Sequence, residues 1–300
     1  MRWYQHDYHT VFTHKLVFST IPCIPKLFHP PIAAVTALIF FVLLKKERRA
    51  IAGNLRRILG RSGLRIWWKA YRAFYSFCDF VVSYCYVPRA DDRALLAMLA
   101  PFGHGAQTIG RSLEQGNGLI VWTAHLGNWE FASRLLELHG RRVNVARVVE
   151  RDNPAEMMLR DMMTNPRLNV IQLNDNPLAP VELLNALRNN EIVAMQGDRV
   201  YRSFCAEAQF FGATARFPMG PFFLAYISGA PLLPGFVLRR KWLRYRVILG
   251  EPIVFPHIGE RDPELRAGLQ KAVRFLEENV RAYPEQWLNF YDFWSEDRQQ

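Results

Sequence analysis

The segment AHLGNWE at residues 124–130 holds the side chains whose types and spacing best suit acid–base chemistry. A short apolar run precedes it and an amphipathic stretch follows it, which predicts a buried strand, a turn at Gly127 and a helix. With His125 in the turn and Glu130 in the first helical turn, Glu130 would hold one imidazole nitrogen and leave the other as a general base. Spacing alone leaves an alternative open, in which His125 caps the helix and Glu130 is a first-turn acid.

The segment Gly197-Asp198-Arg199 follows a second apolar run, residues 191–196, which also predicts a strand. In a parallel sheet, Asp198 and Arg199 would lie at the same carboxyl edge as His125, where the sites of α/β proteins gather. The forked guanidinium of Arg199 suits a phosphate or a thioester oxygen, although a salt bridge within the loop would equally explain the pair. The sequence lacks the G-x-S-x-G, H-E-x-x-H and Walker motifs, and no metal site is expected.

These two segments need a scaffold of alternating strands and helices, and the apolar pattern predicts one. Further strands are expected at residues 142–149, 169–173, 232–238 and 245–249. Helices are expected at residues 128–139, 154–163, 180–189, 220–228 and 262–283. This alternation predicts the α/β class, with a mainly parallel central sheet flanked by helices over residues 91–300.

The amino-terminal quarter differs from the rest in charge. Thirteen Lys or Arg residues and two acids within residues 1–75 account for the whole net charge of +11. The bases alternate with apolar and aromatic residues at helical spacing, so residues 1–90 are expected to form a helical region that binds an anionic membrane surface. A solvated helix face is the alternative, and nucleic acid is not the expected partner. The apolar run Ile32–Leu44 is shorter than the roughly 20 residues that cross a bilayer, which favours an interfacial or buried helix but leaves a crossing open.

Several segments in this order resemble the bacterial lipid A biosynthesis (lauroyl/myristoyl) acyltransferase family, part of the glycerolipid acyltransferase superfamily with its H-x4-D/E signature. The resemblance covers about residues 40–295 and rests on five blocks: basic residues 45–59, AHLGNWE, Gly197-Asp198-Arg199, FFG…A…P.GP within residues 210–221, and Ala230–Pro234. It implies a single acyltransferase domain that moves a fatty acyl group from an acyl carrier protein or coenzyme A thioester to a hydroxyl of a lipid or glycolipid. No cofactor or metal would be needed.

The resemblance also implies roles for particular residues. His125 would be the general base on the acceptor hydroxyl, Glu130 its partner, and Arg199 a group that assists the oxyanion or a substrate phosphate. The residues expected to bind substrate are Asn128, Asp198, Arg199, Phe211, Gly212, Pro218 and Gly220. The protein would act at the cytoplasmic face of the bacterial inner membrane, as a peripheral or monotopic protein.

Two segments depart from the family pattern. Residues 284–294 lack the basic W..H.RF ending of lipid A enzymes, and the R-x-x-N-P block matches only loosely, with either Arg147 or Arg151 as its arginine. These departures leave the acceptor open between lipid A and another glycolipid, an amino-acid lipid or a polyene lipid. An alternative from a different class is a catalytically silent protein that keeps the fold and binds membranes or nucleic acid.

Overall fold

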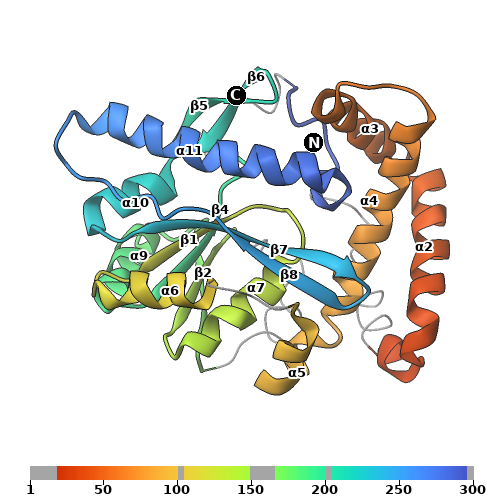
Figure 1. The fold of residues 1–300 in the computed structure, drawn as a ribbon, viewed down its shortest axis with the longest axis horizontal. Helices are drawn as coiled ribbons and strands as arrows, with labels where there is room; N and C mark the ends of the chain where they lie inside the picture. The colour runs from red at the N-terminus through yellow and green to blue at the C-terminus, as the bar shows by residue number, and fades with distance from the viewer. Residues whose placement is uncertain (1–18, 101–104, 149–165, 201–203, 296–300) are drawn as a thin grey trace.

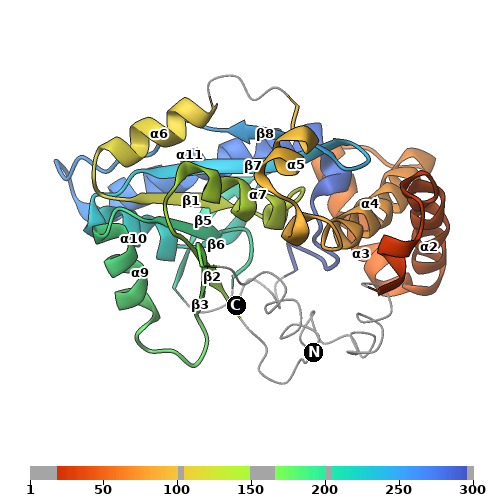
Figure 2. The ribbon, with the colours of Figure 1, turned by 90° about the horizontal axis from the view of Figure 1, so that it is seen from below.

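A six-stranded sheet lies at the centre of the computed structural model, which describes residues 19–100, 105–148, 166–200 and 204–295 (Figures 1 and 2). Its strands in spatial order are β3 (Leu168–Gln172), β2 (Val143–Arg147), β4 (Ile192–Gln196), β1 (Leu119–Thr123), β7 (Leu232–Lys241) and β8 (Arg244–Leu249). The first five run parallel, and β8 pairs antiparallel with β7 at one edge. The predicted α/β class with a mainly parallel sheet is therefore confirmed.

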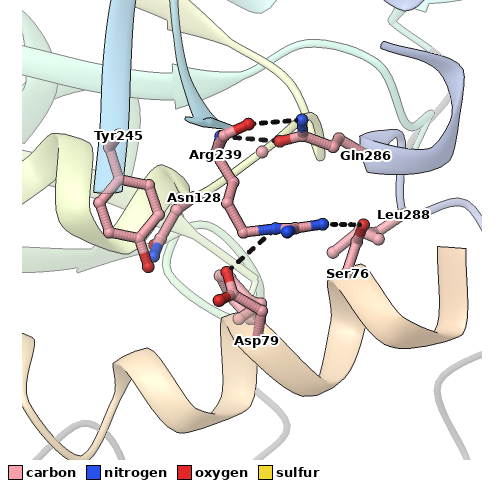
Figure 3. Close-up of a pocket in the computed structure, with 9 residues that line it drawn as sticks. Ser76, Asp79, Asn128, Arg239, Tyr245, Gln286 and Leu288 are labelled. Atoms are coloured by element: carbon pink, nitrogen blue, oxygen red, sulfur yellow. Dashed lines mark hydrogen bonds and ion pairs between the residues drawn. The ribbon is translucent and has the colours of Figure 1, made fainter. Parts of the chain in front are cut away.

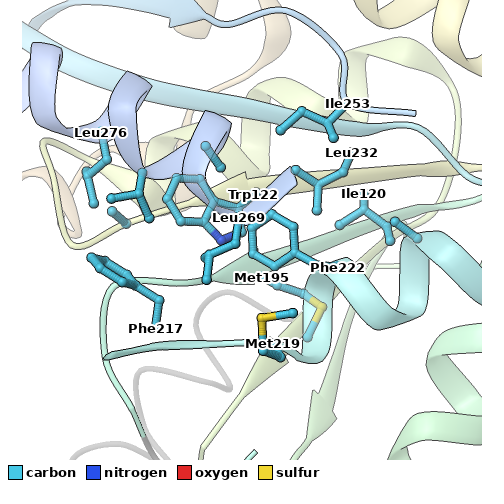
Figure 4. Packing of buried hydrophobic residues seen from close by; sticks show 14 of the residues in the cluster. Ile120, Trp122, Met195, Phe217, Met219, Phe222, Leu232, Ile253, Leu269 and Leu276 are labelled. Atoms are coloured by element: carbon cyan, nitrogen blue, oxygen red, sulfur yellow. The ribbon is translucent and has the colours of Figure 1, made fainter. Parts of the chain in front are cut away.

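The central strands are buried on both faces, which explains why their sequences read as unbroken apolar runs. Successive residues of β1 point to opposite sides of the sheet. Ile120 and the fully buried Trp122 face one core, whereas Leu119 and Val121 face another. Figure 4 shows Trp122 packed among side chains from the sheet and from the helices that cover the first core.

Helices cover both faces of the sheet, as the alternation of elements predicts. The first face carries α9 (Ala179–Arg188), α10 (Gly220–Ser228) and α11 (Arg261–Ala282). The second carries α6 (Gly105–Glu114) and α7 (Trp129–Leu136). A short helix, α5 (Asp92–Met98), lies before α6, and the side chain of Asp91 caps it by accepting from the Ala94 amide. The left-handed Gly140 follows the α7 segment at the predicted C′ position.

The described part of the basic amino-terminal region, from residue 19 onward, is helical, with one helix on the outside of the molecule. It consists of α2 (His29–Leu43), α3 (Lys45–Leu59) and α4 (Leu64–Ser83), preceded by single turns at Ile21–Cys23 and Lys26–Phe28. Figure 1 shows α2 alongside α4 at the edge farthest from the sheet. Among the described residues, the stretch Lys26–Leu43 is the one helical segment long and apolar enough to cross a membrane, with mean hydropathy 1.8 and 17% of its residues buried.

Two parts of the fold are not evident from the apolar pattern. Strands β5 (Cys205–Phe210) and β6 (Ala213–Pro218) form a hairpin whose turn residues, Phe211 and Gly212, both have positive φ. The carboxyl-terminal residues after α11, Pro284–Ser295, return to the carboxyl edge of the sheet and pack against α3, and we call them the C-terminal strap. The helix predicted at 154–163 lies outside the described residues, and the division at residue 90 stays a prediction.

Candidate active site

The turns after β1 and β4 bring His125 and Asp198 together at the carboxyl edge of the sheet. The two strands pair in parallel with Thr123 opposite Gln196, so the chain leaves both at the same level. The Nδ1 atom of His125 lies 2.7 Å from Oδ1 of Asp198, and the His125 backbone amide donates to both carboxylate oxygens at 3.1 Å. The expectation that Asp198 lies at the same edge as His125 is confirmed.

The C-terminal strap supplies the remaining hydrogen bonds to Asp198. Trp287 donates its indole N–H to Oδ2 at 3.0 Å, and Asn289 donates its side-chain amide to the same oxygen at 3.1 Å. Asp198 is fully buried, which by itself would raise its pKa. The contact with His125, the charge of Arg199 and the Asn289 hydrogen bond outweigh burial and hold the pKa of Asp198 well below its usual range. Asp198 is therefore an ionised acceptor.

Because Asp198 only accepts, Nδ1 of His125 must carry the proton, which leaves Nε2 as the unprotonated nitrogen. Burial, with the nearby charge of Arg199, lowers the pKa of His125 to about 4 despite the opposing effect of Asp198. The imidazole is thus neutral at neutral pH. Its side chain is 13% exposed and stands edge-on to Trp129, with ring centroids 5.0 Å apart. A neutral imidazole with a fixed tautomer can accept a proton at Nε2.

Glu130 lies in the first turn of the helix, as expected, but its carboxylate has other partners than the one expected. It is buried in the first turn of α7, where its carboxylate accepts from the Tyr84 hydroxyl at 2.8 Å and pairs with Arg147. Glu130 was expected to hold one nitrogen of the imidazole, and the structure instead places Asp198 against Nδ1. The physical reason is that Asp198 follows the strand adjacent to β1, whereas the first helical turn directs Glu130 toward α4 and β2. Its catalytic role stays a prediction.

Two arginines flank the dyad in different ways. Arg199 donates from Nε to the Asn289 side chain at 2.7 Å and from a terminal nitrogen to the Leu288 carbonyl at 2.9 Å, so it holds the C-terminal strap. Arg147 lies at the end of β2, is paired with Glu130 and has a side chain that is 23% exposed. Its charge also acts to lower the pKa of His125. Of the two candidates for the R-x-x-N-P arginine, Arg147 is thus at the site, whereas Arg151 lies outside the described residues.

Glycines at two positions let the backbone pass close to its neighbours. Gly127 has φ +76°, and a Cβ there would lie 2.1 Å from the Val237 carbonyl oxygen. A Cβ at Gly197 would lie 1.8 Å from the Trp122 indole nitrogen. Any side chain at either position would therefore displace the turn that carries His125 or Asp198. The Gly127 amide also donates to the Gln286 carbonyl at 2.9 Å, which ties the His125 turn to the C-terminal strap.

A buried polar cluster beneath this turn fixes the C-terminal strap to β7 and α4 (Figure 3). The side-chain amide of Gln286 accepts from the Arg239 backbone N–H at 2.8 Å and donates to the Arg239 carbonyl at 2.9 Å. The Arg239 guanidinium donates to Ser76 at 3.1 Å and pairs with Asp79 at 3.4 Å, both on α4. Burial raises the pKa of Asp79 to about 7, partly opposed by Arg239. The turn that carries His125 is thus held from three elements: the C-terminal strap, β7 and α4.

The remaining residues expected to bind substrate have structural contacts here. Asn128 is the N-cap of α7, accepting from the Phe131 amide at 3.0 Å and donating to Ser83 at 2.8 Å. Phe211 and Gly212 form the β5–β6 turn, where the Phe211 amide donates to Glu277 of α11. Pro218 and Gly220 lie at the end of β6 and the start of α10. Their roles in binding substrate stay predictions. Within the described residues, no cluster of His, Cys, Asp and Glu is suited to hold a metal.

Sequence reasoning missed three residues of this site: Trp287, Asn289 and Tyr84. Trp287 and Asn289 lie 89 and 91 residues beyond Asp198, and no local pattern links so distant donors to an acid. The one signal was their place in the segment that departs from the family ending. Tyr84 was hidden in an aromatic-rich helix, where packing is the default explanation for such a residue.

The sequence was then compared with known proteins. Residues 4–296 match the family described as bacterial lipid A biosynthesis acyltransferase. The chain is similar to the phosphatidylinositol mannoside acyltransferase of Mycobacterium tuberculosis, at 28% identity over 215 residues, which are 70% of this chain and 65% of that protein. It is similar to the protein of the same name in Mycolicibacterium smegmatis, at 25% identity over 198 residues, 62% of this chain and 60% of that protein. The matched stretch thus spans a little under two-thirds of these curated relatives.

Proposed function

Because the chain belongs to the bacterial lipid A biosynthesis acyltransferase family, we propose that it transfers a fatty acyl group from a thioester to a hydroxyl of a lipid or glycolipid. The observation that carries this proposal is the His125–Asp198 dyad. It combines a buried, ionised carboxylate with a neutral imidazole whose Nε2 is the basic nitrogen. A buried carboxylate that is held by four donors and set against a neutral imidazole favours a catalytic role over the catalytically silent alternative.

In the proposed reaction, Nε2 of His125 removes the proton from the acceptor hydroxyl as its oxygen attacks the thioester carbonyl. Asp198 stabilises the imidazolium that forms, through the hydrogen bond to Nδ1. The tetrahedral oxyanion then collapses and breaks the carbon–sulfur bond, and the leaving thiolate takes the proton from Nε2. The products are an acyl ester and a free thiol. The imidazole and the carboxylate return to their starting states.

We assign the role of oxyanion or phosphate partner to Arg147 rather than to Arg199. The charges of both arginines lower the pKa of His125, that of Arg199 more strongly. Arg199 is held by Asn289 and Leu288 in the C-terminal strap, whereas Arg147 extends from the end of β2 with a side chain that is 23% exposed. Glu130 and Tyr84 would fix the guanidinium of Arg147 in place from its buried side. Positioned cations of this kind stabilise charge that develops during acyl transfer.

The relatives named as phosphatidylinositol mannoside acyltransferases favour a glycolipid other than lipid A as the acceptor. The departure of residues 284–294 from the lipid A ending is consistent with that choice. The donor is proposed to be acyl carrier protein or coenzyme A carrying the fatty acid, since both present a thioester. These donors are cytoplasmic, so the protein would act at the cytoplasmic face of the inner membrane, as a peripheral or monotopic protein.

The test is acyl transfer by the full-length protein in the presence of lipid extracts from its host. The fatty acyl group carries a radioactive label and is supplied in separate assays as the thioester of acyl carrier protein or of coenzyme A. The labelled lipid and the released thiol are both quantified. We expect one thiol released for each acyl ester formed on a glycolipid fraction. His125→Ala should lose both products while keeping its thermal unfolding temperature within a few degrees.

Two results would refute this assignment. Thiol release without labelled lipid would indicate a thioesterase, in which water replaces the acceptor hydroxyl. Equal transfer by wild type and by His125→Ala would exclude the imidazole as the base. Transfer to purified lipid A, but to no other glycolipid, would correct the acceptor while keeping the mechanism.

A further inference from the structure

The side of α2 that faces away from the protein is apolar and exposed. Its residues are between 43% and 81% exposed. They are Leu27 and Phe28, in the turn that precedes α2, and Ile32, Val35, Leu38, Ile39, Val42 and Leu43, and we call them the α2 outer face. Spacings of three and four residues place Phe28, Ile32, Val35, Ile39 and Val42 in one row along the helix. A row of large apolar side chains this long is unusual on a surface that contacts only water.

The opposite side of α2 is attached to the protein along its length. His29, Ala33 and Ala37 are buried in a second row. At one end the His29 ring lies 6.3 Å from the ring of Trp242, in the β7–β8 turn. In the middle the Tyr71 hydroxyl donates to the Ala34 carbonyl at 3.1 Å. At the other end Phe41 packs edge-on against aromatic rings of α4. The helix is therefore part of the folded body.

Exposed basic residues flank α2 at both ends. Lys26 precedes the helix, and the end of β7, next to Trp242, adds Arg240 and Lys241 at the same end. Lys45, Lys46 and Arg49 follow at the start of α3. An apolar strip with cationic groups at both ends is complementary to a lipid surface, whose acyl chains lie beneath anionic phosphates.

We propose that α2 lies flat in the interfacial layer of an anionic membrane, with its outer face among the acyl chains, and that it does not cross the bilayer. The apolar helical stretch Lys26–Leu43 extends about 27 Å, close to the roughly 30 Å of a hydrocarbon core, so its length permits a crossing and its packing decides against one. A crossing would carry α4 into the hydrocarbon, because the two helices are packed side by side (Figure 1). The buried Asp79–Arg239 pair and the charged α3 would follow, at high cost.

This orientation sets the depth of the active site, a step that rests on the proposed function. The side of α4 away from α2 carries Phe80, whose ring centroid lies 4.2 Å from that of Trp129, and Tyr84, which donates to Glu130. The dyad would thus be separated from the membrane by about one helix diameter, roughly 10 Å. An acceptor headgroup would reach His125 while its acyl chains stay in the bilayer.

The first test measures binding of the full-length protein to vesicles. Because this binding needs no acyl transfer, its result is independent of the proposed function. Val35→Asp combined with Ile39→Asp should lower partitioning onto anionic vesicles more than tenfold. Val254→Asp with Ile258→Asp, which are exposed apolar residues near α11, is the matched control and should bind as wild type. Lys45→Gln and Lys46→Gln should each weaken binding roughly fivefold, an effect that vanishes on neutral lipid.

The second test separates a flat helix from a crossing one. Two proteins are labelled with nitrobenzoxadiazole, and both carry Cys205→Ser. The first is labelled at the exposed Cys23. The second carries Cys23→Ser and is labelled at the cysteine introduced by Leu43→Cys. Dithionite added outside the vesicles should reduce both labels equally, because both ends of a flat helix face the same solution. Protection of either label would overturn the proposal. Vesicle binding that is unaffected by Val35→Asp with Ile39→Asp would also overturn it. So would the finding that wild type does not bind vesicles but self-associates, if these substitutions abolish the self-association.

Discussion

Replacing Asp198 by asparagine changes one oxygen to an amino group and removes a buried negative charge. Every partner of this carboxylate is a donor: the His125 amide and Nδ1, the Trp287 indole and the Asn289 amide. An asparagine in either orientation must direct its own N–H groups at one set of these donors. If the amino group faces His125, Nδ1 has to become the acceptor, and the proton moves to Nε2. The base is then lost although the fold is kept.

The size of this effect follows from the two roles of the carboxylate. A wrong tautomer and the loss of charge opposite the imidazolium lower kcat by roughly 10³- to 10⁴-fold, or about 4 to 5.5 kcal/mol of barrier. The buried donors left facing an amino group cost about 1–3 kcal/mol of folding free energy. Asp198→Asn should therefore remain folded at moderate temperature, with most of its activity gone.

The assay is single-turnover acyl transfer, with the amount of folded protein checked by thermal unfolding. Asp262→Asn is the matched control, because it removes a carboxylate that is 71% exposed at the start of α11. We expect this control to transfer at the wild-type rate. Purified Asp198→Asn with an intact unfolding transition and a lost transfer rate would support the role of the carboxylate in catalysis.

Glu130→Gln distinguishes the observed geometry from the one expected at first. Glu130 accepts from Tyr84 and pairs with Arg147, so its loss should disturb the arginine and reduce kcat by roughly 10- to 100-fold. If Glu130→Gln abolished transfer while Asp198→Asn kept more than a third of it, our reasoning would be wrong. Glu130 would then be the partner of the imidazole.

Three further predictions concern the same turn. Burial lowers the pKa of His125 to about 4, so the imidazole stays unprotonated as the pH falls through about 6.5. We therefore expect kcat/KM to decline only near pH 4. A decline centred near pH 6.5 would contradict the buried environment of His125. Asn289→Leu removes one hydrogen-bond donor to Asp198, which should raise the pKa of that carboxyl and lower kcat roughly tenfold. Asn176→Leu is the surface control and should leave kcat unchanged. Gly127→Ala places a methyl group against the Val237 carbonyl, so the unfolding temperature should fall by several degrees, and an unchanged transition would show that the turn can relax.

Most of the fold could be predicted because its elements have local signatures. The strands from Leu119, Ile192 and Leu232 are continuous apolar runs, and α10 was predicted with its observed bounds. The β5–β6 hairpin was missed, because its turn places Phe211 at a positive φ instead of the usual Asn or Asp. That choice reflects packing of the phenyl ring against Trp294 and beneath Arg281, which only the tertiary structure reveals.

The active site was predicted in part for a related reason. His125 and Asp198 were placed at one edge because parallel strands end together, a rule that can be applied to sequence. Which carboxylate meets the imidazole depends on strand order, since β4 is adjacent to β1 whereas Glu130 lies on a helix that turns away. The fixation of Arg199 by Asn289 depends on the C-terminal strap, and no local pattern encodes it.

The position of the C-terminal strap has a consequence for biosynthesis. A ribosome releases the chain from its amino terminus, so His125 and Asp198 emerge long before Trp287 and Asn289, which are 89 and 91 residues downstream of the carboxylate. A nascent chain halted before the strap would have the strands and the turns of the site, but not the donors that hold its acid. The proposed activity should therefore arise only after residues 284–295 have left the ribosome, and shorter nascent chains should be inactive.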